Sequence, residues 1–162
     1  MSNKIWEFTG ETKIHLGTTL KRIRAAVEFK LKCGIVVVRG ELGGWIEKES
    51  NLSGDAWVSG DARVSGNARV SGNAEVYGNA RVSGNAEVSG NGDYIVFKNC
   101  WSSFRWFTYT RSNKKWSVGC FYGTGEELIE KAYKDSDVSG KCYEAIVRAQ
   151  EEIYKTIEDV KK

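Results

Sequence analysis

Residues 54–89 read GDAWVS GDARVS GNARVS GNAEVY GNARVS GNAEVS, which is one hexapeptide written six times in a row. Valine returns at every sixth position from Val58 to Val88, and alanine does so from Ala56 to Ala86. An α-helix cannot use this period, because six residues turn through about 600° and successive valines would step around its surface. A meander of hairpins does not fit either, because its turns do not recur every six residues. The repeat therefore predicts a coil in which each hexapeptide supplies one short strand and one corner.

Three hexapeptides close one triangular turn, so that residues about 18 positions apart lie above one another. Valine then points inward in every turn, and alanine fills the inner side of each corner. The Gly-Asn and Gly-Asp pairs supply the backbone freedom that a corner needs. The outward positions stack in three pairs: Trp57 on Glu75, Arg63 on Arg81, and Arg69 on Glu87.

The Val-x-x-x-Ala spacing resembles that of the hexapeptide-repeat family, which includes many acyltransferases and the gamma-class carbonic anhydrases. The resemblance covers residues 54–92 closely and residues 44–94 loosely. One departure is that Ser or Tyr follows the valine, where the family often has Gly or an acidic residue. The resemblance implies a left-handed parallel β-helix, and it implies a homotrimer in which the subunits pack by one flat face.

The expected fold is mainly β, with three parts. A short left-handed parallel β-helix (residues 44–93) lies between an N-terminal β cap (residues 1–43) and a C-terminal α+β cap of three strands and two helices (residues 94–162). The caps are needed because a short coil leaves unpaired backbone at both ends. The inward valines also form a thin core that buries little surface per residue, which again favours a trimer.

In the N-terminal part the sequence predicts a hairpin of residues 3–8 and 12–16, with its turn at residues 9–11. Further strands are expected over residues 20–27 and 34–40. His15 is the only histidine of the chain. We expect it to lie in the hairpin, away from the repeats and without a catalytic role, because no second histidine or metal-ligand set accompanies it.

The C-terminal part starts with a basic and aromatic stretch, and residues 94–125 contain no Asp or Glu. Alternation predicts strands at residues 94–98, 104–111 and 115–121, with a hairpin loop at residues 112–114.

Two helices are predicted after these strands. Thr124 followed by Glu127 is a capping-box pattern, and it starts a helix that runs to about Lys134. A second helix starts near Ser139. Its apolar stripe suits packing on the sheet or a three-helix contact across a trimer. The stripe consists of Cys142, Ile146, Ala149, Ile153, Ile157 and Val160.

The basic and aromatic stretch could bind a phosphorylated ligand. Aromatic rings stack on bases, Arg and Lys pair with phosphate, and the N–H groups at the start of a helix accept an anion. The alternative is that the aromatic residues form an ordinary core beneath a solvated basic edge. The candidate ligand-binding residues are Arg105, Trp106, Tyr109, Arg111, Lys115, Trp116, Tyr122, Gly123, Thr124 and Gly125.

Arg63 and Arg81 form a second candidate. Like charges that lie one turn apart in a sheet are destabilising, so this pair needs a partner. Either Glu75 or Glu87 of a neighbouring subunit pairs with the two arginines, or the arginines hold an anionic ligand.

The sequence indicates no catalytic residue, metal site or cofactor. Residues 44–162 contain no histidine, so the acyl-transfer base and the zinc ligands implied by the resemblance are missing. No P-loop, nucleophile elbow or paired-carboxylate pattern is present. The four cysteines lack metal-ligand spacing, and we expect them to be reduced and mostly buried.

The composition limits the partners and the location that can be expected for the protein. The N-terminus has no apolar signal segment, and the longest aliphatic run, at residues 35–38, is too short to cross a membrane. We therefore expect a cytoplasmic protein with no membrane partner. The net charge of +3 is too small to indicate nucleic acid as a partner.

Residues 40–52 and 116–128 resemble small hexapeptide-repeat proteins encoded by phages and prophages. That resemblance implies a counter-defence role in the host cytoplasm, in which an oligomer sequesters a nucleotide immune signal without cutting it. The first hypothesis is therefore a non-enzymatic homotrimer that binds a small phosphorylated ligand. One alternative is a structural or protein-interaction module with the coil as a trimeric spacer, and another is a single-stranded nucleic-acid binder.

Overall fold

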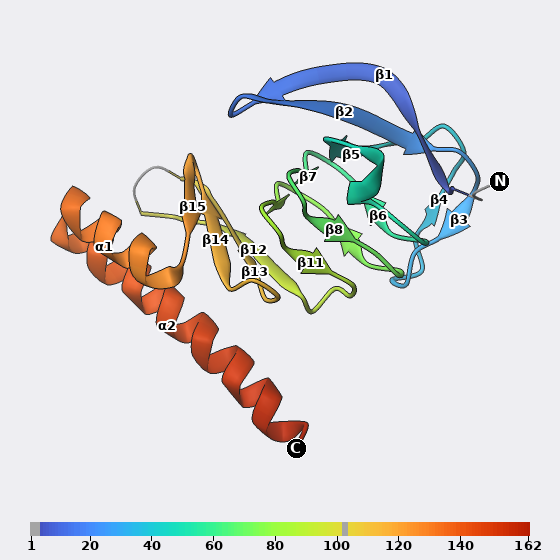
Figure 1. Ribbon diagram of the computed structural model, residues 1–162. Coiled ribbons are helices and arrows are strands. Elements are labelled where there is room, and N and C mark those ends of the chain that lie inside the picture. Colours follow the sequence, from blue (N-terminus) through green and yellow to red (C-terminus); the bar gives the residue numbers. More distant parts are fainter. Residues whose placement is uncertain (1–3, 102–103) are drawn as a thin grey trace.

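The computed structural model describes residues 4–101 and 104–162. Figure 1 shows short coils in the middle of the molecule, a long hairpin beside them, and a sheet with two helices on the other side. The fold is mainly β, as the sequence predicted, and it has two α-helices.

The repeats form two-residue strands that pair in parallel with the strand about 18 residues further along. β7 pairs with β10, β8 with β11, and β6 with β9. The triangular turn and the three outward stacks are confirmed. Every repeat valine and alanine is fully buried, so the inside of the coil is lined by these two residue types. The strands are β6 (Trp57–Val58), β7 (Arg63–Val64), β8 (Arg69–Val70), β9 (Glu75–Val76), β10 (Arg81–Val82) and β11 (Glu87–Val88).

The coil has three faces, which we name for their outward residues. The arginine face consists of β5 (Leu42–Ile46), β7 and β10, and it places Arg63 between Trp45 and Arg81. The open face consists of β8 and β11, whose Arg69 and Glu87 are exposed. The third face consists of β6 and β9, with Trp57 above Glu75.

The N-terminal part caps the first turn by strand pairing. β1 (Trp6–His15) and β2 (Thr18–Ala25) form an antiparallel hairpin, and β2 pairs with the free edge of β5. The sheet of the arginine face therefore continues as β1-β2-β5-β7-β10. A small hairpin of β3 (Phe29–Lys30) and β4 (Val36–Val37) follows β2, so only two residues of the strand expected at residues 34–40 form.

The predicted position of the first turn was wrong. The chain reverses at Leu16 and Gly17, where φ is 48° and 79°. Positive φ at both central residues is the geometry of the tight turn that matches the twist of a hairpin. Residues 9–11 instead lie at an irregularity where the register shifts between Phe8 and Thr12.

The C-terminal sheet has four strands, where the sequence predicted three. They are β12 (Tyr94–Lys98), β13 (Trp106–Thr110), β14 (Lys115–Val118) and β15 (Phe121–Gly123), in that order in the sheet. The predicted strand at residues 115–121 is broken at Gly119, which has a φ of 57° and turns the chain back.

The chain after the last repeat caps the last turn with side chains, from the segment before β12, from β13 and from the β13–β14 turn. In earlier turns the first N–H of a strand donates to an alanine carbonyl in the next turn, for example Arg63 N to Ala80 O at 2.9 Å. In the last turn no further strand follows, and side-chain oxygens accept instead. The three bonds are Glu75 N to Asn91 Oδ1 (2.8 Å), Arg81 N to Thr108 Oγ1 (2.9 Å) and Glu87 N to Ser112 Oγ (2.7 Å).

The helices are α1 (Gly125–Asp135) and α2 (Asp137–Val160). The capping box of Thr124 and Glu127 is confirmed. The prediction that the stripe from Cys142 to Val160 could pack on the sheet was wrong for most of its length, because α2 buries Gly140, Tyr143, Val147 and Gln150 instead. That face lies about 100° around the helix from the stripe.

The expectation of mostly buried thiols was also wrong. Cys33, Cys100 and Cys120 are exposed, and Cys142 is half-buried. Across the described part of the chain, neither helix is both long enough and apolar enough to span a bilayer.

Candidate anion-binding cleft

The structure divides the predicted ligand-binding residues among separate places. A cleft brings together Arg63, Arg81 and Tyr122. A wider groove contains Tyr109, Arg111, Trp116 and Gly125. Arg105 lines a shallow hollow with Asp135 and Tyr143. The remaining residues line none of these three hollows: Trp106, Lys115, Gly123 and Thr124.

Most of the aromatic residues belong to the core beneath the two helices. Phe107 and Trp116 are fully buried, and Tyr109 is nearly so. The rings cover one another: Tyr109 lies 4.9 Å from Trp116, and Phe97 stacks on Phe107 at 4.8 Å. Almost all of the surface of Phe107, Tyr109 and Trp116 is buried, so little is left on which a base could stack, which supports the alternative of plain packing for this part of the stretch.

The start of α1 is occupied by its own side chains. Thr124 Oγ1 accepts from Glu127 N at 3.2 Å, and Glu127 Oε2 accepts from Thr124 N at 2.7 Å. Glu126 adds a second carboxylate to the first turn. Since an incoming phosphate would meet two negative charges here, this helix end does not favour an anion.

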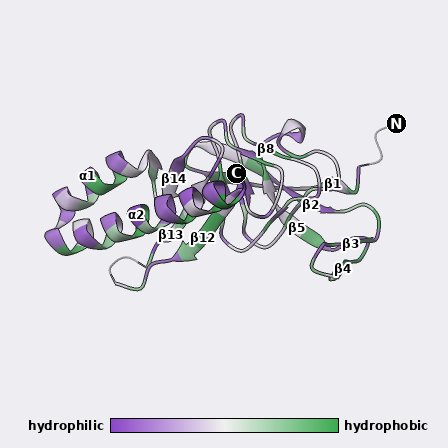
Figure 2. Cartoon of the chain, turned by 90° about the horizontal axis from the view of Figure 1, so that it is seen from below, coloured by the Kyte–Doolittle hydropathy of each residue, from purple (hydrophilic) through white to green (hydrophobic). Residues whose placement is uncertain are grey.

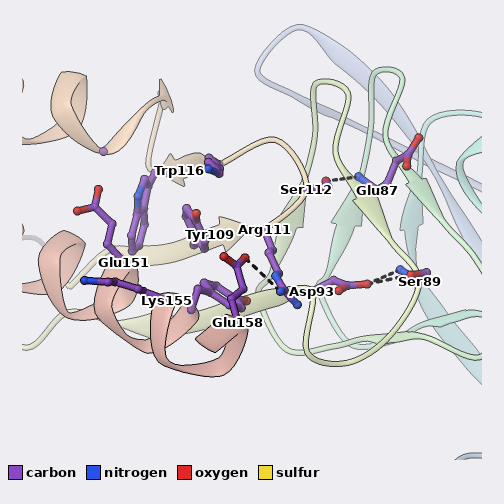
Figure 3. Close-up of a pocket in the computed structure, with 13 residues that line it drawn as sticks. Glu87, Ser89, Asp93, Tyr109, Arg111, Ser112, Trp116, Glu151, Lys155 and Glu158 are labelled. Carbon is purple, nitrogen blue, oxygen red and sulfur yellow. Dashed lines mark hydrogen bonds and ion pairs between the residues drawn. The ribbon is translucent and has the colours of Figure 1, made fainter. Parts of the chain in front are cut away.

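The groove of about 620 Å³ lies between α2, the β13–β14 hairpin and the last turn of the coil (Figure 3). Much of its charge is balanced within the chain. Arg111 pairs with Glu158 at 3.3 Å, and Glu151 pairs with Arg148 at 3.1 Å. Asp93 accepts from the backbone of Ser89 at 2.8 Å. The groove therefore lacks a concentrated charge of one sign.

The cleft has a different character. It lies on the arginine face, between the tip of the β1–β2 hairpin and the β14–β15 turn, and has about 90 Å³ of free volume. Arg63 and Arg81 come from β7 and β10 one turn apart, and His15 comes from the end of β1. The hydroxyl-bearing residues Ser65, Ser83 and Ser117 complete its polar wall.

The cleft contains few acceptors for its positive charge. Arg63 Nη1 lies 3.3 Å from His15 Nε2, and Arg81 Nη1 donates to the carbonyl oxygen of Gly119. The Nε of Arg63 is buried and has no hydrogen-bond partner among the described residues. No ion pair within the described ranges includes Arg63 or Arg81.

The pKa values of two residues in the cleft reflect this excess of cations. Burial, and then the charge of Arg63, lower the pKa of the Arg81 guanidinium. Burial, followed by the charges of Arg63, Arg81 and Lys13, lowers the pKa of His15. Because a guanidinium can only donate, His15 Nε2 must accept from Arg63, and the imidazole is neutral in this geometry.

Two sequence-based expectations change here. His15 does not lie away from the repeats, because the hairpin folds along the arginine face and brings it against Arg63. Glu75 is not available to a neighbouring subunit, because its side chain is buried and its Oε1 accepts from Lys32 N at 2.9 Å. Glu87 lies on the open face, so it could reach the two arginines only as part of another subunit that enters the cleft.

Sequence reasoning missed His15 as a member of this site. The only available signal was the Leu16-Gly17 turn, which sets the end of β1, and the packing of a hairpin tip on a distant strand is not encoded locally. Within residues 4–101 and 104–162, no three His, Cys, Asp or Glu side chains gather as a metal site would require.

Comparison with known proteins adds one finding. A family profile described as YdcK Beta solenoid repeat matches residues 62–78 and 74–90, which lie within the coil. No curated protein matches the chain, and no solved structure does. Together with the parallel pairing of strands 18 residues apart, the match shows that the middle of this chain is a β-solenoid of short repeats.

Proposed function

We propose that the protein binds a small ligand through a phosphoryl group held in the cationic cleft, and that it holds this ligand without transforming it. The observation that carries the proposal is the stacked pair Arg63 and Arg81, which has no carboxylate partner in the described chain. Two guanidinium groups one turn apart repel each other, and an anion between them would remove that repulsion.

The size of the cleft supports a phosphoryl group. One water molecule needs ~10–15 Å³ of such free volume, so the cleft's 90 Å³ has room for roughly six to nine water-sized atoms, which is enough for a phosphate group. The rest of a larger ligand would lie outside. Tyr122 stands at the mouth and is 43% exposed, so its ring could contact a base or sugar. Nucleotides, including the immune signals expected from the phage resemblance, are therefore the first ligands to test.

The state of His15 supports binding over catalysis. A general base needs a free lone pair, and the Nε2 lone pair already accepts from Arg63. The charged groups that act on this imidazole are cations, so no carboxylate orients it as in a catalytic pair.

We also propose that the solenoid is left-handed and that the protein is a homotrimer, as the family resemblance implies. The open face suits a three-fold contact, because Arg69 and Glu87 are both exposed there and could form ion pairs with other copies. Such a contact would leave the cleft accessible on a different face.

Isothermal titration at low salt tests the binding proposal, with adenosine 5′-monophosphate as probe and adenosine as its uncharged match. We expect the monophosphate to bind at least about tenfold more tightly, because charge-assisted hydrogen bonds contribute roughly 1.5–3 kcal/mol. Arg63→Gln should remove this preference. Arg69→Gln, the same repeat position on the open face, should keep it.

Equal binding of the two probes, or unchanged affinity in Arg63→Gln, would overturn the cleft assignment. The ligand recovered after prolonged incubation should be intact by mass spectrometry, and conversion to a product would overturn the non-enzymatic part of the proposal.

A further inference from the structure

The outward face of α2 is apolar and uncovered. Ile153 is 50% exposed, Ile157 is 38% exposed and Val160 is 82% exposed. Figure 2 shows apolar and polar segments alternating along the helix. Ala149 is also exposed, whereas Cys142 and Ile146 at the start of the stripe are half-buried.

This stripe is not needed for packing within one chain. The helix already buries a second face, with Tyr143 and Val147 in the core beneath it. The last turns are attached through polar contacts: Tyr154 Oη donates to Gly92 O at 2.9 Å, and Arg111 pairs with Glu158. An apolar stripe that extends past these contacts into solvent is typical of an interaction surface.

The spacing of the stripe fits a second helix. Its members recur at a distance of 11 residues: Cys142 and Ile153, Ile146 and Ile157, Ala149 and Val160. An 11-residue period is close to that of an undistorted helix, so the stripe stays on one side along its whole length. Ala149, the smallest member, lies near its middle, where two helices could approach most closely.

The charges beside the stripe identify the partner and its direction. On the flank away from the core, the N-terminal half of α2 carries Lys141 and Arg148, and the C-terminal half carries Glu152 and Asp159. A parallel copy would place the basic half of each helix beside the basic half of its partner, and the acidic halves beside each other. An antiparallel copy that crosses at the level of residue 150, next to Ala149, would place Lys141 opposite Asp159 and Arg148 opposite Glu152. Arg148 also pairs with Glu126 and Glu151 of its own chain, which holds its side chain along the helix.

We propose that α2 docks on α2 of a second copy of this chain, antiparallel and about a two-fold axis. Such a contact is self-complementary, because each half of the helix meets the opposite half of its partner. The α2 contact lies away from the cleft and from the open face. It could therefore form in a simple dimer, and it could also join two trimers into a hexamer.

Native mass spectrometry of the full chain tests the contact. We expect an even number of subunits, and we expect Ile153→Glu to halve that number at the same concentration. Val36→Glu is the control, because Val36 is similarly exposed (49%) but lies on β4, away from α2. A monomer, a trimer alone, or an Ile153→Glu protein with unchanged mass would overturn the proposal, as would retention of a different protein on the helix.

Charge reversal tests the direction. Lys141→Glu should weaken the association by up to roughly thirtyfold, since the two-fold contact contains this ion pair twice and each exposed pair contributes up to about 1 kcal/mol. The double variant Lys141→Glu with Asp159→Lys should restore it if the helices are antiparallel. Failure of this rescue, with the single variant weakened, would overturn the antiparallel arrangement.

Discussion

The arginine face and the open face are built from the same hexapeptide, and they differ outside the coil. Both pair in parallel register and both bury valines completely on the inside. Their outward stacks are Arg63 on Arg81 in one case and Arg69 on Glu87 in the other. In this solenoid the inward positions set the fold, while a single outward residue decides whether a face balances its own charge or needs an anion.

The largest expected effect is the loss of stability when a buried valine is shortened, and it tests whether the arginine face and the open face share one core. Val64→Ala and Val70→Ala should each lower the free energy of unfolding by about 2 kcal/mol, because each leaves a cavity in a fully buried position. Urea denaturation would measure both losses. A difference between them greater than about 1 kcal/mol would mean that the faces already differ inside the coil.

Arg63→Glu should convert the arginine face to the charge pattern of the open face. The new carboxylate would lie one turn from Arg81 and close to His15, so we expect stability to rise by about 1 kcal/mol while binding of the monophosphate is lost. Thermal denaturation and titration measure the two quantities on one sample. A less stable protein that still binds would contradict our account of this face.

The pH dependence of the cleft comes from one imidazole. The pKa of His15 is lowered in the folded protein, so the unfolded chain binds more protons between that value and the ordinary value of 6.5. Stability should therefore be complete above about pH 6.5 and fall as the pH drops through this window. A nuclear magnetic resonance titration can follow the only histidine directly. Its pKa should lie below 6.5 and rise when phosphate is added, and an unshifted apo value would contradict the predicted environment.

The smallest expected effect is the reverse exchange. Glu87→Arg would place two arginines on the open face and should cost about 0.5 kcal/mol of stability, because the side chains there remain hydrated. It should not create binding of the monophosphate, since position 87 lines the wide groove together with the carboxylates of Asp93 and Glu158, and not a narrow cationic cleft. Binding gained by this variant would show that two stacked arginines are sufficient without a cleft.

The repeat and the start of α1 could be predicted because their determinants are local. The six-residue valine period specifies the turn, and Thr124 with Glu127 specifies the start of α1. The need to cap both ends was also evident. That the last turn would be closed by Asn91, Thr108 and Ser112 was not evident, because a side-chain cap leaves no pattern in the sequence.

The site could be predicted only in part. Spacing alone identified Arg63 and Arg81 as a pair in need of a partner. His15 joins them through the packing of a hairpin tip on a strand 48 residues away in sequence, a contact that no short-range pattern contains. The prediction of which face of α2 is buried was wrong for a related reason: the helix has two apolar faces, and periodicity does not tell which of them is covered.

The side-chain cap allows the length of this solenoid to change only in whole turns. Each of its three acceptors meets a strand on a different face, so the cap fits the coil in one rotational setting. Insertion of three hexapeptides would move the whole C-terminal part about 4.8 Å along the axis and keep the three capping bonds, whereas insertion of one would turn it by a third of a revolution. Each permitted step adds one outward position to every face, so the row of residues that ends in Arg81 can grow only one whole turn at a time.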